Sequence, residues 1–233
     1  MALPSISTPE FKTKIPSTGE PITYRPFLVK EEKILLMAME GNDAKEIEHA
    51  VKTILKNCIL DDLSIDELAT YDMEYLFLQL RAKSVGEVIE LKVTHPDKDK
   101  ECKHGTDISI KVDDIKVINT SQEKKIMLTD NIGVMMKHPT LGDSMTVNQN
   151  DTDAVFEILA KCIDYVFDEE NVYNDYKLEE LVEWINGLNQ EQFQKILKFF
   201  ESMPKLSHNI KWTCELCGEK DEVKIEGLNN FFT

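Results

Sequence analysis

The sequence predicts an α+β fold in which two helical blocks alternate with β-hairpins. Apolar residues recur at helical spacing in two separate stretches, roughly 30–80 and 151–202. Alternating apolar and polar residues in 87–118 and 209–225 predict antiparallel hairpins instead. Cysteine and histidine residues gather at the tips of these two hairpins. A metal ion shared between the tips would join the hairpins into a zinc-ribbon-like unit.

This alternation divides the chain into five segments. They are an N-terminal arm and hairpin (1–27), a helical block (28–86), a strand region with the first half of the metal site (87–140), a second helical block (141–206), and a C-terminal hairpin with an apolar tail (207–233). Prolines make the first hairpin a pair of edge strands, and a lone hairpin is marginal in water. We therefore expect it to pack on the following helices or on another subunit.

Capping residues indicate where the helices of the first block begin and end. Residues 30–38 form the first helix, which ends at Gly41, and Asn42 or Asp43 caps the second. The third helix is predicted to begin at Ser64, with Glu67 in the capping-box position.

The rest of the chain alternates strands and helices. Residues 124–136 read as a second two-stranded element. Asp151, Thr152 or Asp153 is expected to cap a helix that runs through 162–166. Helices over 178–185 and 190–202 follow, bounded by glycine and proline.

The most specific motif is Cys214-Glu-Leu-Cys217-Gly218, a turn between two strand-like runs. Two thiolates on one tight turn can hold a metal ion, but a tetrahedral site needs two more ligands. The other Cys/His cluster contains His95, Cys102 and His104. We predict Cys102, His104, Cys214 and Cys217 as ligands of a structural Zn²⁺, with His95 as the alternative fourth ligand.

The remaining cysteines and histidines have plainer interpretations. Cys58 and Cys162 lie in apolar patterns and are expected to be buried free thiols. His208 is expected to form a hydrogen bond, and His138, which precedes a proline, to lie in a loop. A thioredoxin-type redox motif would place Cys214 and Cys217 at a helix N-terminus, where strands are predicted instead.

The composition restricts the class of partner. A formal charge of −16 argues against binding to nucleic acid or to anionic membranes, and favours basic protein partners or simply solubility. Five cysteines without a disulfide pattern fit a reducing cytoplasm. We expect neither a signal peptide nor a membrane span.

The sequence contains no recognisable catalytic constellation. A glycine-rich phosphate loop, a nucleophile elbow and a His-Glu-x-x-His motif are all missing. Carboxylate runs such as Asp168-Glu169-Glu170 are typical of solvated surface. The protein is therefore predicted not to be an enzyme.

Four stretches resemble the baseplate hub assembly proteins of T-even-like contractile-tailed bacteriophages. They are 15–36 (IPSTGEPITYRPFLVKEEKILL), 80–87 (LRAKSVGE), 126–134 (IMLTDNIGV), and the C-terminal CELCG followed by Gly227-Leu228 and Phe231-Phe232. The resemblance implies a tail morphogenesis protein that contacts other baseplate or tail proteins, with self-association left open. It would be located in the virion baseplate, or in the host cytoplasm during assembly.

The same resemblance suggests which parts of the chain make assembly contacts. Residues 1–27 and 228–233 are the expected contact elements, and deleting either is expected to leave a folded, zinc-loaded monomer that fails to complement. The alternative function is a zinc-ribbon adaptor in transcription or nucleic-acid processing. The adaptor would bind nucleic acid in a salt-sensitive manner, whereas a redox enzyme would have a low-pKa thiol.

Overall fold

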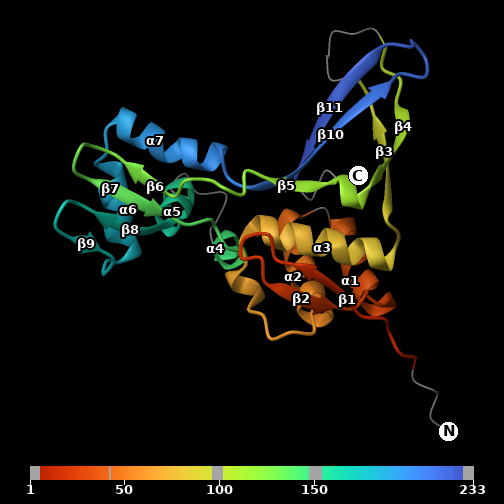
Figure 1. Ribbon diagram of the computed structural model, residues 1–233, viewed down its shortest axis with the longest axis horizontal. Coiled ribbons are helices and arrows are strands. Elements are labelled where there is room, and N and C mark those ends of the chain that lie inside the picture. Colours follow the sequence, from red (N-terminus) through yellow and green to blue (C-terminus); the bar gives the residue numbers. More distant parts are fainter. Residues whose placement is uncertain (1–5, 42, 96–101, 147–153, 228–233) are drawn as a thin grey trace. The chain divides into compact units, whose positions relative to one another are not determined.

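The computed structural model describes residues 6–41, 43–95, 102–146 and 154–227, and has the predicted α+β class. The chain divides into two compact units (Figure 1). Unit 1 comprises 1–65, 71–118 and 205–233, and unit 2 comprises 66–70 and 119–204. Each unit therefore joins segments that lie far apart in the sequence.

Unit 1 combines a helical part with three small antiparallel sheets. Its elements are β1 (Phe11–Lys14), β2 (Pro21–Tyr24), α1 (Val29–Gly41), α2 (Ala44–Cys58), most of α3 (Thr70–Ser84), β3 (Val88–Val93), β4 (Thr106–Lys111), η2 (Val112–Asp114), β5 (Lys116–Ile118), β10 (Lys205–Thr213) and β11 (Lys220–Glu226). The sheets are β1-β2, β3-β4 and β11-β10-β5. The C-terminal hairpin thus gains a third strand, β5, which the sequence pattern does not separate from β4.

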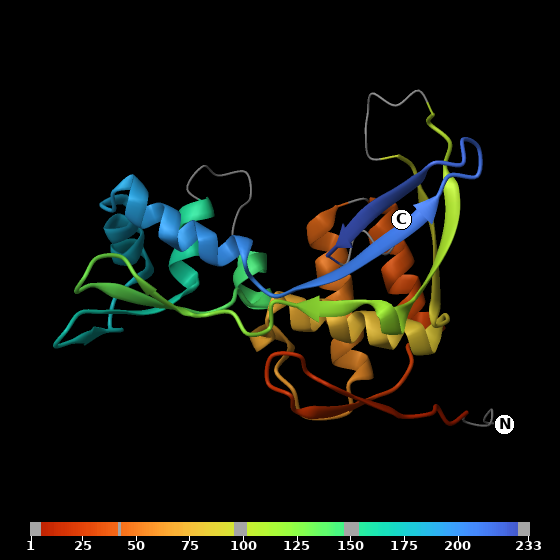
Figure 2. The same cartoon turned by 45° about the horizontal axis from the view of Figure 1, so that its top comes forward.

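The β3–β4 and β10–β11 hairpins lie side by side in both views (Figures 1 and 2). Strict alternation buries Ile89, Leu91 and Val93 on one face of β3. These side chains share a core with Leu78 of α3 and with Leu206 of β10. The predicted hairpins therefore form, and one apolar core holds them together.

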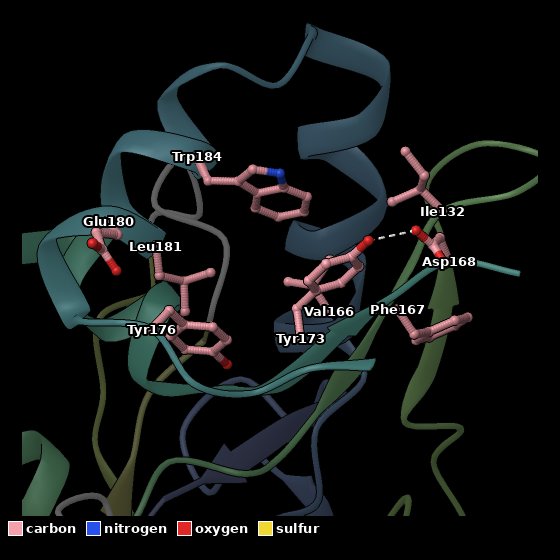
Figure 3. A pocket seen from close by; sticks show the side chains of 9 residues that line it. All are labelled: Ile132, Val166, Phe167, Asp168, Tyr173, Tyr176, Glu180, Leu181 and Trp184. Carbon is pink, nitrogen blue, oxygen red and sulfur yellow. Dashed lines mark hydrogen bonds between the residues drawn. The ribbon is translucent and has the colours of Figure 1, made fainter. Parts of the chain in front are cut away.

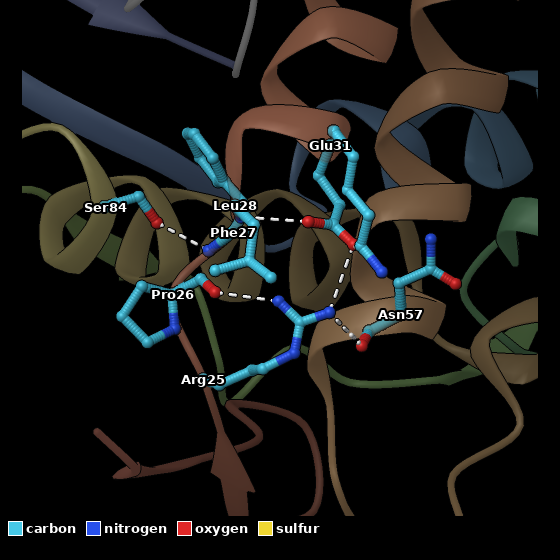
Figure 4. A network of polar contacts seen from close by, with 8 residues as sticks. Arg25, Pro26, Phe27, Leu28, Glu31, Asn57 and Ser84 are labelled. Carbon is cyan, nitrogen blue, oxygen red and sulfur yellow. Dashed lines mark hydrogen bonds and ion pairs between the residues drawn. The ribbon is translucent and has the colours of Figure 1, made fainter. Parts of the chain in front are cut away.

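The N-terminal hairpin packs on the helices of its own chain, which is the first of the two arrangements expected from the sequence. Tyr24 of β2 bridges to Ile59 after α2, and the Ser17 amide donates to Asp72 of α3. Arg25 donates to the Glu31 carboxylate and to the Asn57 carbonyl (Figure 4). The hairpin is thus part of the folded body of unit 1.

The second and third helices begin differently from each other. Asp43 caps α2 by accepting from the Lys45 amide, as predicted, whereas Asn42 lies outside the described residues. The prediction that Ser64 begins the third helix is wrong. A short 3₁₀ turn, η1 (Ile65–Glu67), comes first, and α3 begins at Thr70. Ala69 forms a β-bridge with Thr140, and this pairing excludes it from the helix.

In its described residues, unit 2 contains a four-stranded antiparallel sheet and four α-helices. Its elements are β6 (Lys125–Met127), β7 (Gly133–Met136), α4 (Leu141–Thr146), α5 (Ala154–Lys161), β8 (Ile163–Phe167), β9 (Val172–Tyr173), α6 (Leu178–Asn186) and α7 (Gln190–Glu201). The strand order is β6-β7-β8-β9. Val134 of β7 and Val166 of β8 face a core that also contains Leu181 of α6 and Ile196 of α7.

One helix prediction in this unit is wrong in part. The helix expected to run through 162–166 ends at Lys161, and β8 follows directly. Cys162 and Val166 are buried in the structure, and the predicted helix also placed them on its apolar face, so an expectation of burial does not distinguish helix from strand. Val166 pairs with Val134 of β7, and this pairing favours a strand over a helix at 163–167. The expected caps Asp151, Thr152 and Asp153 lie outside the described residues.

Other predictions for unit 2 are confirmed. The two-stranded element over 124–136 forms β6 and β7, and Gly187 caps α6. Asn189, which the sequence reading did not single out, caps α7. Across the described parts of the chain, every helix is too short or too polar to cross a bilayer.

Candidate metal centre

Two loops of unit 1 bring four candidate ligands together. His95 and Cys102 lie in the connection between β3 and β4, and Cys214 and Cys217 lie in the turn between β10 and β11. One ligand atom from each residue lies within 4.8 Å of all the others. The neighbouring hairpins thus place their tips at a single point, as the zinc-ribbon hypothesis requires.

The turn that holds Cys214 and Cys217 is closed by backbone hydrogen bonds. The Cys214 amide donates to the Glu219 carbonyl at 2.9 Å, and the Gly218 amide donates to the Cys214 carbonyl at 2.9 Å. Gly218 has φ of +72°, which residues with a Cβ rarely adopt. Glycine after the second cysteine therefore permits the tight turn that directs both thiols toward one point.

The distances between ligand atoms fit a tetrahedral zinc ion. A Zn–S bond of about 2.3 Å implies a separation of roughly 3.8 Å between two ligating sulfurs. The Sγ atoms of Cys102 and Cys214 are 3.7 Å apart, which is far longer than a disulfide bond. The Cys217 Sγ atom lies 3.3 Å from His95 Nε2. Three thiols and one imidazole make a Cys₃His donor set of the kind that closes structural zinc sites.

A carboxylate holds the His95 ring. His95 Nδ1 lies 2.8 Å from Asp221 Oδ2 on β11, and the ring packs against Trp212 with centroids 5.0 Å apart. The His95 side chain is 1% exposed. A histidine that binds a metal commonly donates its other ring N–H to a carboxylate, and this contact fixes the tautomer. With Nδ1 engaged by Asp221, Nε2 is the atom left to face the thiols.

His104, the predicted fourth ligand, is not among the four clustered residues. Its Nε2 atom lies 4.0 Å from Glu215 Oε2, and its side chain is 38% exposed. Only one residue separates it from Cys102, so this short segment would have to bend for both side chains to reach the same ion. The structure brings His95, the alternative ligand, to the thiols instead. His208 accordingly stays apart and contacts the Asp114 carbonyl at 3.1 Å.

The thiols have unequal affinities for protons. The pKa of Cys214 is lowered to about 6, because its thiolate accepts from the backbone N–H of Cys217 and from further neighbours. A hydrogen bond with the Glu219 backbone alone would lower the pKa of Cys217. Burial and the adjacent thiols of Cys214 and Cys102 outweigh this hydrogen bond, and the pKa of Cys217 is raised. One thiol therefore ionises readily, and a bound cation would favour ionisation of the others.

The surroundings of the cysteine pair differ from those of a thioredoxin-type site. Cys214 and Cys217 lie in the turn between the strands β10 and β11, and not at the start of a helix. Cys58 and Cys162 are fully buried free thiols, as predicted, and burial raises the pKa of Cys58 to about 11 and that of Cys162 to about 12. The only clustered thiols among the described residues are thus those of the candidate metal centre.

Comparison with known families identifies the class of protein. The family model described as T4 bacteriophage base plate protein matches residues 8–233. The chain therefore belongs to this family, and its role lies in the structure or assembly of the phage baseplate, within the virion tail. Searches of curated proteins and of solved structures found no match.

Proposed function

We propose that this chain is a non-enzymatic component or assembly factor of the baseplate hub that acts through contacts with other baseplate proteins. The observation that carries the proposal is the family match over residues 8–233. The assignment to the hub rests on the resemblance of 15–36, 80–87, 126–134 and the C-terminal CELCG stretch to hub assembly proteins.

In this proposal the metal centre is structural. Four protein ligands would fill the tetrahedral coordination of Zn²⁺ and leave no position for water or substrate. The ion would fasten the β3–β4 connection to the β10–β11 turn and so complete a zinc-ribbon-like unit. Hydrolytic chemistry at the metal needs an open coordination position, so a closed site supports a non-enzymatic role.

The part of the N-terminal segment that is available for contacts with other proteins is smaller than the expected 1–27. Ile15, Ile22 and Tyr24 of the hairpin are buried in unit 1. Deleting residues 1–27 would expose the apolar surface that they cover, so we expect this deletion to destabilise the fold. Ile6 in the preceding arm is 91% exposed and belongs to the part that remains available for contacts. The expected tail, 228–233, lies outside the described residues.

Mass spectrometry of purified virions and of infected-cell lysate tests the location. Peptides at stoichiometric levels in the particle indicate a structural component, whereas peptides confined to the lysate indicate an assembly factor that departs. Electron microscopy of particles made by a phage that lacks the gene tests the assignment to the hub. We expect baseplates without their central part, and an intact centre with peripheral defects would refute the assignment.

The zinc-ribbon adaptor is the second candidate function, and the Cys/His cluster is the observation that favours it. It predicts that the purified protein binds single- or double-stranded nucleic acid and loses affinity as salt rises. With a formal charge of −16, we expect no binding at physiological salt in a fluorescence anisotropy titration.

A further inference from the structure

Unit 2 contains a cavity of about 410 Å³ between the β8–β9 end of its sheet and helix α6. Tyr176 and Leu181 lie on one side of the space, Tyr173 and Val166 on the other, and the Trp184 indole across its end (Figure 3). None of these residues belongs to the candidate metal centre. The cavity therefore needs an explanation of its own.

Hydrogen bonds hold two of the aromatic rings in place. The Tyr173 hydroxyl donates to Asp168 Oδ2 at 2.7 Å, and the Tyr176 hydroxyl donates to the Asp164 carbonyl at 3.1 Å. Tyr173 lies on the edge strand β9 and is 48% exposed, so its ring is accessible from solvent. The cavity thus presents pre-positioned aromatic surfaces, which bind a ligand at a low cost in side-chain entropy.

The charged side chains that line this cavity are acidic. Asp168 and Glu180 line it, and the described lining residues include no lysine or arginine. Between residues 164 and 183 the sequence has eight carboxylates and one lysine. Aromatic faces attract cations through their quadrupole, and carboxylates at the rim add to this attraction.

We propose that this cavity binds an arginine or lysine side chain from a basic segment of a partner protein. The aliphatic part of that side chain would pack against Val166 and Leu181. Its charged end would lie between the aromatic rings of Tyr173, Tyr176 and Trp184, within reach of the Asp168 and Glu180 carboxylates. Glu180 caps the backbone of α6 through Lys177, so its position is fixed before binding.

The same unit already contains one contact of this kind. The Lys125 ammonium lies 4.8 Å from the centroid of the Phe167 ring. Phe167 also lines the cavity, but Lys125 occupies its ring, so we assign the incoming cation to the other three aromatic residues. The acidic composition of the chain as a whole supports a basic partner, since opposite charge accelerates association.

The test uses the full-length protein and a short synthetic peptide, acetyl-Val-Gly-Arg-Gly-Val-amide. Matched peptides carry lysine, citrulline or norleucine in place of arginine. The chain has two tryptophans, so two indole N–H signals report binding by NMR. Trp184 lines the cavity, whereas Trp212 contacts His95 in the candidate metal centre and serves as an internal control.

A matched pair of double variants separates a specific site from general charge. Asp168→Asn with Glu180→Gln removes the two lining carboxylate charges. The remaining oxygen at position 168 can still accept from the Glu170 and Asn171 amides, its new amide nitrogen can donate to the Tyr173 hydroxyl, and the oxygen at position 180 can accept from the Lys177 amide. Glu169→Gln with Glu179→Gln removes the same charge from neighbouring exposed positions outside the cavity lining. Both pairs are conservative surface changes, so both variants are expected to fold.

We expect the arginine and lysine peptides to shift the Trp184 signal saturably and to leave Trp212 unchanged. The lining variant should bind about tenfold more weakly than the control variant, which corresponds to about 1.4 kcal/mol. Three results would overturn the proposal. These are equal binding of the citrulline or norleucine peptide, equal loss in both double variants, or no Trp184 shift up to about 10 mM peptide. Since the probe is synthetic, none of them depends on the proposed role in the hub.

Discussion

His95 Nδ1 lies 2.8 Å from Asp221 Oδ2, while the opposite ring nitrogen, Nε2, lies 3.3 Å from the Cys217 thiol. The imidazole therefore joins a carboxylate on β11 to the sulfur cluster. This orientation is the one in which a histidine binds a metal through Nε2 and donates from Nδ1. It distinguishes His95 from His104, although both lie near Cys102 in the sequence.

The first prediction concerns the ligand set. We expect the wild-type protein to bind one equivalent of Zn²⁺, His95→Ala to lose most of it, and His104→Ala to keep it. Elemental analysis of the dialysed proteins at neutral pH measures the stoichiometry. Loss of zinc from His104→Ala with retention in His95→Ala would reverse the assignment. Absence of zinc from the wild-type protein would refute the metal centre altogether.

The second prediction concerns Asp221. Replacing it with asparagine removes the charge that orients the His95 ring, and loss of such a partner typically costs about 10–100-fold in metal affinity. Competition with a chromophoric chelator measures the affinity. Glu222→Gln is the matched control, because Glu222 contacts Asn209 across the hairpin and does not contact His95. Equal affinities in the two variants would show that Asp221 does not act through the histidine.

The hairpins could be predicted because their signals are local. Alternation in β3 and the Cys-x-x-Cys-Gly turn depend on neighbouring residues, and the structure has both where they were expected. Asp221 was missed because nothing near it in the sequence indicates that it faces His95, 126 residues away.

The errors elsewhere arise from pairing between distant segments. The apolar residues between 155 and 166 fit a helix, and only Met136 and Val134 of β7 explain why the chain becomes strand β8 at Ile163. Similarly, the capping pattern at Ser64 is overridden by pairing of Ala69 with Thr140. The cavity near Trp184 was not predicted either, since Asp168 appears in the sequence as ordinary solvated surface.

The third prediction concerns the buried carboxylate of Glu31. Glu31 is fully buried, accepts from Arg25 and from the Leu28 amide, and so joins the hairpin to α1 (Figure 4). Glu31→Ala leaves the guanidinium without this partner, and breaking a buried pair costs about 3 kcal/mol or more in the free energy of unfolding. Urea denaturation measures the loss, with the exposed Glu32→Ala as control.

The pH dependence of this contact has a defined sign. Burial alone would raise the pKa of Glu31, but hydrogen bonds from Arg25 and Leu28 outweigh it and lower that pKa. The stabilisation is therefore present above the pKa of an unfolded glutamate and is lost as the pH falls through the lower folded value. A Glu31→Ala penalty that stays constant down to acidic pH would contradict this account.

The fourth prediction concerns His138 in unit 2. Its ring stacks on Phe199 with centroids 5.7 Å apart, and Nε2 lies 2.9 Å from the Gln122 side-chain oxygen. Burial, with a smaller contribution from Lys124, lowers the pKa of His138 from 6.5 to about 4. Between these two values the unfolded chain binds a proton that the folded chain does not. The contribution of the neutral His138 ring to the stability of unit 2 should therefore be fully present above pH 6.5 and decrease as the pH falls toward 4.

Replacement of His138 by glutamine separates this effect from the titration of carboxylates in the same range. Glutamine can still contact Gln122 but does not titrate, so the variant should lose stability less steeply, by up to about 1.4 kcal/mol per pH unit. Urea denaturation followed through the Trp184 indole signal reports on unit 2, and His49→Gln on the exposed surface of α2 is the control. If His138→Gln and wild type lose stability in parallel from pH 6.5 to 4, the buried imidazole does not contribute to the acid sensitivity of this unit. Its stacking on Phe199 would then be retained in the protonated state, and the cost of burying the charge would have to be offset by Gln122.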